Sequence, residues 1–195
     1  MLSDFWFNLK LGLFHVLDWN AYDHVLFLIA LVATCTFTHY KKVFYLVSVF
    51  TIGHTLSLCL AAYDVITVKS EIIEFLIPVS ILFTAIYNIL FYKKNTKTNS
   101  LYMLYFFTLF FGLVHGFGFS YYFNMISQSA ENKFVMLIEF ALGVELSQLI
   151  VVLFVLILAF LLQNVFKVSK RDWVLIASSI VIGLCIPILR ETWIL

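Results

Sequence analysis

Histidines and carboxylates are the residues of this chain that could do chemistry, and they lie within long apolar stretches. His54 and His115 are each inside such a stretch, Asp23 and His24 begin another, and Glu145 lies in a fourth. An ionisable side chain in hydrocarbon is costly without partners, so each is a candidate functional residue. Imidazoles and carboxylates brought together would suit a borderline divalent transition metal, namely zinc, nickel or cobalt.

The composition indicates an all-α membrane protein. Of the 195 residues, 63% are hydrophobic and only 12% are charged, and the mean hydropathy is +1.03. Soluble domains contain about 45–50% apolar residues. Cys35, Cys59 and Cys185 are too widely spaced for a metal-ligand pair or a disulfide framework. The basic residues are scattered in loops, so we expect no nucleic-acid partner. The expected partners are metal ions and membrane lipid.

Apolar stretches predict how the chain crosses the membrane. A helix needs about 20 apolar residues to cross hydrocarbon about 30 Å thick, and six stretches approach or exceed this length. We predict an interfacial amphipathic helix over residues 1–20, because its apolar residues recur at helical spacing. Residues 21–195 then form a single domain, a bundle of about six transmembrane helices. The predicted spans are residues 21–38, 43–62, 72–92, 100–123, 134–163 and 173–189.

The basic residues predict the orientation. Eight of the twelve follow the first, third and fifth predicted spans, which by the positive-inside rule makes those loops cytoplasmic. We therefore expect a multi-pass protein of the bacterial inner (cytoplasmic) membrane with both termini periplasmic or extracellular. Ten of the eleven acidic residues then lie on or near the outer half, whose negative field would attract cations. The eight basic residues are Lys41, Lys42, Lys93, Lys94, Lys97, Lys167, Lys170 and Arg171.

Depth along the predicted helices brings the polar residues to one layer. At about 1.5 Å per residue, His54 and His115 each lie about 12 Å from the outer end of their span. Asp23 and His24 lie at the outer surface, and Glu145 lies about 16 Å deep. We predict that these five residues form a metal site. Weaker candidates are His15, Glu74, Glu139 and Gln148.

Glycines next to the buried histidines support the same layer. Gly53 precedes His54, and Gly116 follows His115. Small residues allow membrane helices to approach closely, which would bring these two histidines together. The alternative is that each histidine is a lone hydrogen-bonding residue between helices.

Several motifs together resemble the HupE/UreJ family of small polytopic bacterial membrane proteins, in particular its second branch. They are residues 12–15, 22–27, 50–55, 74–88, 111–119 and 142–149, in the order of the family. The resemblance implies a nickel or cobalt permease tied to metalloenzyme maturation partners, those of hydrogenase and urease. The functional residues it implies are Asp23, His24, His54, His115 and Glu145. The family signature in the first helix is a histidine followed by Asp-His, and the gap between His15 and Asp23-His24 is longer here.

Three functions follow from these residues. Divalent metal uptake is the function that the resemblance implies. A zinc-dependent intramembrane hydrolase is the second, in which three histidines would hold zinc, Glu145 or Asp23 would be the general base, and the substrate would be a lipid or lipid-linked molecule. A non-catalytic metal-binding accessory protein is the third. The chain contains no G-x-S-x-G, H-E-x-x-H or Walker motif, and the sequence leaves the oligomeric state undetermined.

Overall fold

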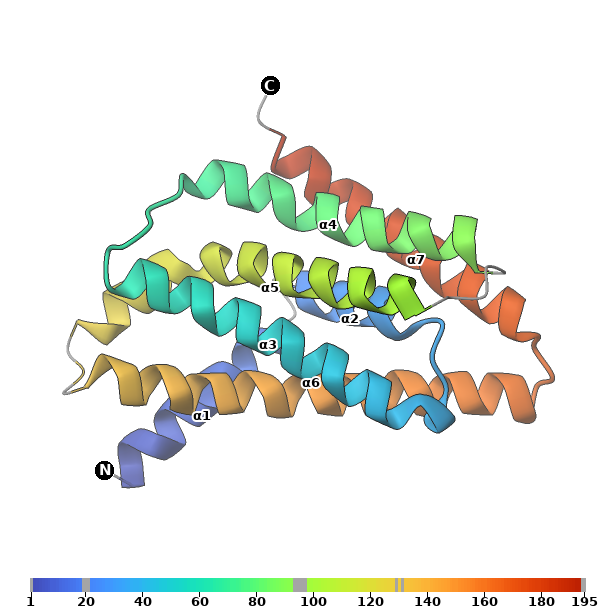
Figure 1. Cartoon of the computed structure of the whole chain (residues 1–195), viewed down its shortest axis with the longest axis horizontal. Helices are drawn as coiled ribbons and strands as arrows, with labels where there is room; N and C mark the ends of the chain where they lie inside the picture. The colour runs from blue at the N-terminus through green and yellow to red at the C-terminus, as the bar shows by residue number, and fades with distance from the viewer. Residues whose placement is uncertain (1, 19–21, 93–97, 129, 131, 194–195) are drawn as a thin grey trace.

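The chain folds as an all-α bundle, as the sequence predicts. The computed structural model describes residues 2–18, 22–92, 98–128, 130 and 132–193, and this part of the chain contains no strand (Figure 1). The predicted boundary between residues 20 and 21 lies outside the described residues, as do Lys93, Lys94 and Lys97. The elements are α1 (Leu2–Val16), α2 (Asp23–Val32), the 3-10 helix η1 (Phe37–His39), α3 (Tyr40–Ala62), α4 (Ser70–Phe91), α5 (Thr98–Ser127), α6 (Lys133–Asn164) and α7 (Lys170–Glu191).

Five of the described helices are long and apolar enough to span a membrane: η1 continuing into α3, and α4, α5, α6 and α7. Their outer faces expose large apolar side chains, including Leu90, Tyr102 and Phe154. Exposed apolar side chains in such number indicate contact with a membrane or another protein. The chain is therefore a multi-pass membrane protein.

The first predicted span, residues 21–38, is a much shorter helix in the structure. α2 ends at Val32, and the Ala33 carbonyl beyond its end accepts a hydrogen bond from Trp173 Nε1 at 3.0 Å. Thr36 then begins η1 with a reciprocal cap, because its side chain and the ring of His39 each bond to the other's backbone amide. A cap that starts a new helix ends the previous one. The usual partner in this cap is Glu or Gln, so a histidine there gives a weak sequence signal.

α1 packs against α6 through two glycines. A side chain at Gly12 would collide with the Phe140 carbonyl, and one at Gly143 would collide with the Leu9 carbonyl, so the two backbones are in direct contact. The predicted helix at the N-terminus is thus present and packed on the bundle; its place at a membrane interface stays a prediction.

α1 and α2 follow one another along the bundle (Figure 1). α1 enters near the end where α6 begins, and α2 continues toward the opposite end, where the Ala30 carbonyl accepts a hydrogen bond from Asn88 Nδ2 at 2.7 Å. Together they resemble one crossing that is interrupted between Val16 and Asp23. Transporters often bind their substrate where a membrane helix is interrupted. This interruption is where two of the histidines lie.

Candidate metal centre

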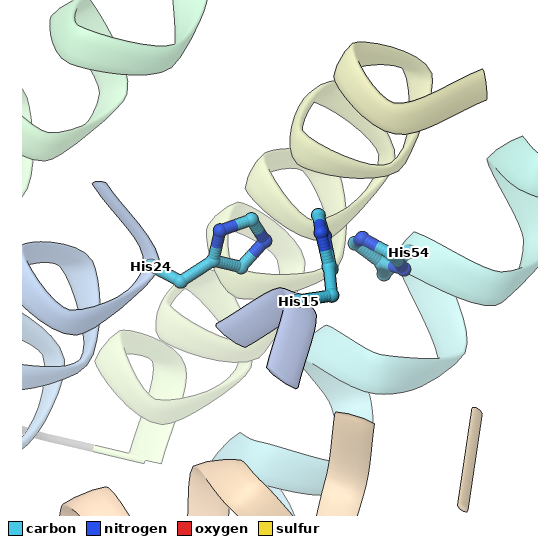
Figure 2. Close-up of side chains that lie close together, drawn as sticks. All are labelled: His15, His24 and His54. Atoms are coloured by element: carbon cyan, nitrogen blue, oxygen red, sulfur yellow. The ribbon is translucent and has the colours of Figure 1, made fainter. Parts of the chain in front are cut away.

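Four histidines from four helices meet inside the bundle. His15 is at the end of α1, His24 at the start of α2, His54 in α3 and His115 in α5. The ring of His24 lies 4.7 Å from that of His15, 5.8 Å from that of His54 and 5.2 Å from that of His115, between ring centroids. One nitrogen from each of His15, His24 and His54 lies within 4.8 Å of the others (Figure 2). These four residues are called the histidine cluster below.

The cluster is buried, yet one nitrogen of each ring has no partner. His24, His54 and His115 expose 3%, 1% and 1% of their surface, and His15 is partly exposed. The Nε2 atom of all four is buried without a hydrogen-bond partner. Leaving a buried polar atom unpaired costs about 1–3 kcal/mol, so such atoms need an explanation. A metal ion that accepts nitrogen lone pairs would give them a partner, and three of the four histidines form a group that could hold one.

In two of the rings, the hydrogen bond at Nδ1 fixes the tautomer in which Nε2 has a free lone pair. His115 Nδ1 lies 2.8 Å from the Phe111 carbonyl oxygen. Because a carbonyl only accepts, Nδ1 carries the hydrogen, and in the neutral ring Nε2 does not. His24 Nδ1 lies 2.9 Å from Asp23 Oδ1, an acceptor of the same kind. Histidine ligands of metals characteristically donate their other N–H to a carboxylate or a backbone carbonyl.

Asp23 therefore contacts the Nδ1 side of the His24 ring, and its carboxylate does not belong to the group of nitrogens that could hold a metal ion. Its Oδ1 accepts from the backbone amide of His24 at 2.7 Å as well as from the ring. Both bonds fix the direction of the imidazole. The carboxylate also brings one negative charge close to the cluster, which favours a cation there.

Close helix contacts bring His54 and His115 to the same depth. A side chain at Gly53 would meet the Leu109 carbonyl, and one at Gly116 would meet the His54 carbonyl and Ser57 Oγ. α3 and α5 therefore touch along their backbones on either side of the histidines. The ring of His24 from α2 lies near both imidazoles.

His15, a weak candidate by sequence, lies within the cluster. Its ring is 4.0 Å from the ring of Phe119 and 5.5 Å from that of His54, between centroids. Gly12, which lies against α6, is one helical turn before His15. A glycine within a turn or less of a histidine occurs at His15, His54 and His115, and this repetition is the sequence signal that could have found it.

The surroundings of the cluster are aromatic. Phe27 lies 5.2 Å from His115, and Phe140 stacks on His54 at 6.3 Å. Phe27 and Phe50 stack on each other at 4.8 Å. Apolar walls of this kind exclude water and strengthen the attraction between an ion and its ligands.

Three of the other predicted site residues bond to side chains outside the histidine cluster, and the fourth is exposed. Glu145 Oε1 accepts from Ser48 Oγ at 2.6 Å, and Ser48 is six residues before His54, or about 9 Å along the helix. Glu139 accepts a hydrogen bond from Asn8 Nδ2 at 2.8 Å. Gln148 bonds to Thr51, and Glu74 is exposed on α4. A role for these four as metal ligands stays a prediction.

The donor set is one of imidazole nitrogens. In the described part of the chain, the group that could hold a metal ion consists of His15, His24 and His54, with the free Nε2 of His115 beside them. Imidazole suits zinc, nickel and cobalt, whereas magnesium and calcium prefer oxygen. The geometry thus favours a transition metal.

The comparisons with known proteins agree with this chemistry. No curated protein and no solved structure is detectably similar to the chain. A family model described as HupE / UreJ protein matches residues 2–191, almost the whole length. This match confirms the resemblance drawn from the motifs, and the chain belongs to the HupE/UreJ family.

Proposed function

We propose that this protein takes up a divalent transition-metal ion, nickel or cobalt, and binds it at the histidine cluster. The observation that carries the proposal is the set of four buried Nε2 atoms without partners at the interruption between α1 and α2. The family is linked to nickel and cobalt uptake, which agrees with the donor set.

A cavity between the histidine cluster and the basic end of the bundle supports a route for the metal ion through the bundle. It has a volume of about 380 Å³ and lies between the second half of α4 and the first half of α5, beside the end of α2. Its wall includes Phe111, whose carbonyl holds His115. Phe27 contacts the rings of both Phe111 and His115, so a thin aromatic layer separates the cavity from the cluster.

The cavity lies toward the end of the bundle that carries the basic residues. Lys42, Lys170 and His39 line it, together with neutral polar groups such as Thr34. By the positive-inside rule this end is cytoplasmic, and the proposed route runs from the opposite end through the cluster to the cytoplasm. This orientation, with the bacterial inner membrane as location, belongs to the proposal.

The hydrolase hypothesis has less support from the geometry. Three imidazoles with an open position would suit catalytic zinc, but the reaction also needs a base close to the activated water. Asp23 bonds to the ring and the backbone of His24, and Glu145 bonds to Ser48 about 9 Å away along α3. Neither carboxylate joins the group of free nitrogens in the described residues.

The test is metal binding followed by uptake. Protein purified in mild detergent without chelator is analysed for bound metal, then titrated with Ni²⁺, Co²⁺ and Zn²⁺ by calorimetry. We expect about one ion per chain, and we expect sealed proteoliposomes to accumulate nickel or cobalt. A wild-type protein that binds none of the three ions would contradict the site. Binding without uptake would contradict transport and favour an accessory or enzymatic role.

A further inference from the structure

A second polar group lies between α3 and α6, about one to two helical turns along α3 from His54. Ser48 Oγ donates to Glu145 Oε1 at 2.6 Å, and Thr51 Oγ1 donates to Gln148 Oε1 at 3.0 Å. Residues three apart on a helix share a face, so each helix contributes two neighbouring groups. These four residues are called the oxygen cluster below.

The two clusters differ in their donor atoms. The histidine cluster offers imidazole nitrogens, whereas the oxygen cluster offers two hydroxyls, a carboxylate and an amide carbonyl. Oxygen donors suit hard cations and imidazoles suit transition metals. The Ser48–Glu145 bond is about 9 Å along α3 from His54, and Thr51 is about 4.5 Å along α3 from His54, so the oxygen cluster neighbours the histidine cluster but differs from it in donor atoms.

One buried polar atom of the oxygen cluster also lacks a hydrogen-bond partner. Gln148 is fully buried, with 0% of its surface exposed, and its Nε2 has no partner. The oxygen and nitrogen of an amide are assigned from their hydrogen bonds. If the amide is turned over, Nε2 donates to Thr51 and the carbonyl oxygen is the atom left free. In that orientation the free oxygen is available to a cation.

We infer that the oxygen cluster binds a sodium ion, which neutralises Glu145. One carboxylate balances one positive charge, whereas a divalent ion there would leave net charge in hydrocarbon, which is costly. A proton on Glu145 would need only the carboxylate and Ser48, and would leave the free oxygen of the turned Gln148 amide without a partner. Secondary transporters hold coupling ions with oxygens near the bilayer midplane. A coupling role for this sodium rests on the proposed uptake function, whereas its binding does not.

The experiment is direct binding of ²²Na⁺ to purified protein in mild detergent, without any transition metal and with choline as the background cation. We expect about one saturable sodium per chain, which potassium competes for weakly. Glu145→Gln should weaken binding at least tenfold, and Ser48→Ala should weaken it by a smaller factor. Glu139→Gln is the matched control: it removes the same charge from the same helix, at a carboxylate bonded to Asn8, and should bind sodium like the wild type.

Two outcomes would overturn the inference. One is a wild-type protein without saturable sodium binding, and the other is an equal loss of sodium affinity in Glu139→Gln and Glu145→Gln. Elution as a single monodisperse species and an unchanged helical circular-dichroism spectrum show that the Glu145→Gln protein is folded; if that variant does not fold, Ser48→Ala decides the result.

Proteoliposomes test the coupling. An inward sodium gradient should speed nickel uptake by the wild type and leave Glu145→Gln unaffected. Uptake that depends on Glu145 and on a proton gradient, but not on sodium, would assign a proton to Glu145 and overturn sodium. Absence of nickel uptake in every condition would contradict the proposed function, while the binding assay would still decide the sodium site.

Discussion

The basic end of the bundle and its interior use the same residue type in different ways. His39, at the basic end, is exposed, and its Nδ1 lies 2.9 Å from Thr36 Oγ1 and 3.2 Å from the Thr36 amide nitrogen. His24, in the cluster, is buried; its Nδ1 contacts a carboxylate and its Nε2 has no partner. The first arrangement completes a helix cap, whereas the second leaves a lone pair aimed at an interior site.

The difference teaches that burial and partners decide what a histidine does. An exposed imidazole obtains its remaining hydrogen bonds from water, so it needs no ligand. A buried imidazole with one nitrogen free needs one, because burying a polar group without a partner is unfavourable. Four substitutions, each with a control variant, test this comparison.

The largest effect is expected from removing a cluster imidazole. His24→Ala should lower nickel affinity by at least about 100-fold, because loss of a group that merely orients a ligand already costs about 10–100-fold. His39→Ala, at the exposed cap, should bind nickel within about twofold of the wild type. Titration calorimetry measures the nickel affinity of both variants. An equal loss of affinity in the two would contradict the distinction between the buried cluster and the exposed cap.

The next effect concerns the group that orients His24. Asp23→Asn keeps the shape of the side chain but removes the charge that holds the Nδ1 hydrogen, so nickel affinity should fall by about 10–100-fold. Asp64→Asn is the control, because Asp64 is exposed in the loop after α3 and has a positive φ of 55°, which asparagine also tolerates. If both variants lose affinity equally, the effect is one of general charge and not of orientation.

A smaller effect should follow from separating α3 and α5. Gly53→Ala places a methyl group against the Leu109 carbonyl, and we expect a loss of about 1–3 kcal/mol in unfolding free energy. Gly183→Ala is the control, since a side chain there meets nothing within 4 Å, and it should be neutral or stabilising. Unfolding by denaturing detergent measures both variants. A Gly53→Ala protein as stable as the wild type would show that the close contact is not required.

The smallest effect is expected in the cavity at the basic end. Lys42→Gln removes a positive charge from the cavity wall, and the rate of nickel uptake should rise by less than about fivefold, since exposed charges contribute about 0.2–1 kcal/mol. Equilibrium binding of nickel should not change. Lys41→Gln, which is exposed and does not line the cavity, is the control. A slower uptake by Lys42→Gln would contradict a cytoplasmic route through this cavity.

Much of the fold follows from the sequence, with the first span as the main difference. The long apolar stretches became α3 to α7, with ends close to those predicted. α2 is shorter because Thr36 and His39 cap the next helix, and hydropathy does not detect a cap. Glycine next to histidine correctly indicated close packing of α3 on α5.

The candidate site was less predictable. The sequence suggested His24, His54 and His115 from their depth and His15 as a weaker candidate, and the structure brings His15 beside His24, with α1 packed on α6 at Gly12 and Gly143. Predicted depth also suggested Glu145 as a residue of the metal site. Depth gives no information on which face of a helix a residue occupies, and in the structure this carboxylate bonds to Ser48.

The sequence by itself determined that this protein is helical and lies in a membrane, because apolar length and charge distribution act locally along the chain. Only the tertiary structure decided which polar residues meet. Contacts between side chains depend on where helices cross and how they are rotated, and the interruption between α1 and α2 sets both for His15 and His24. That is why Thr51 and His54, about one helical turn apart on α3, meet different partners: Gln148 of α6 in one case and the other histidines in the other.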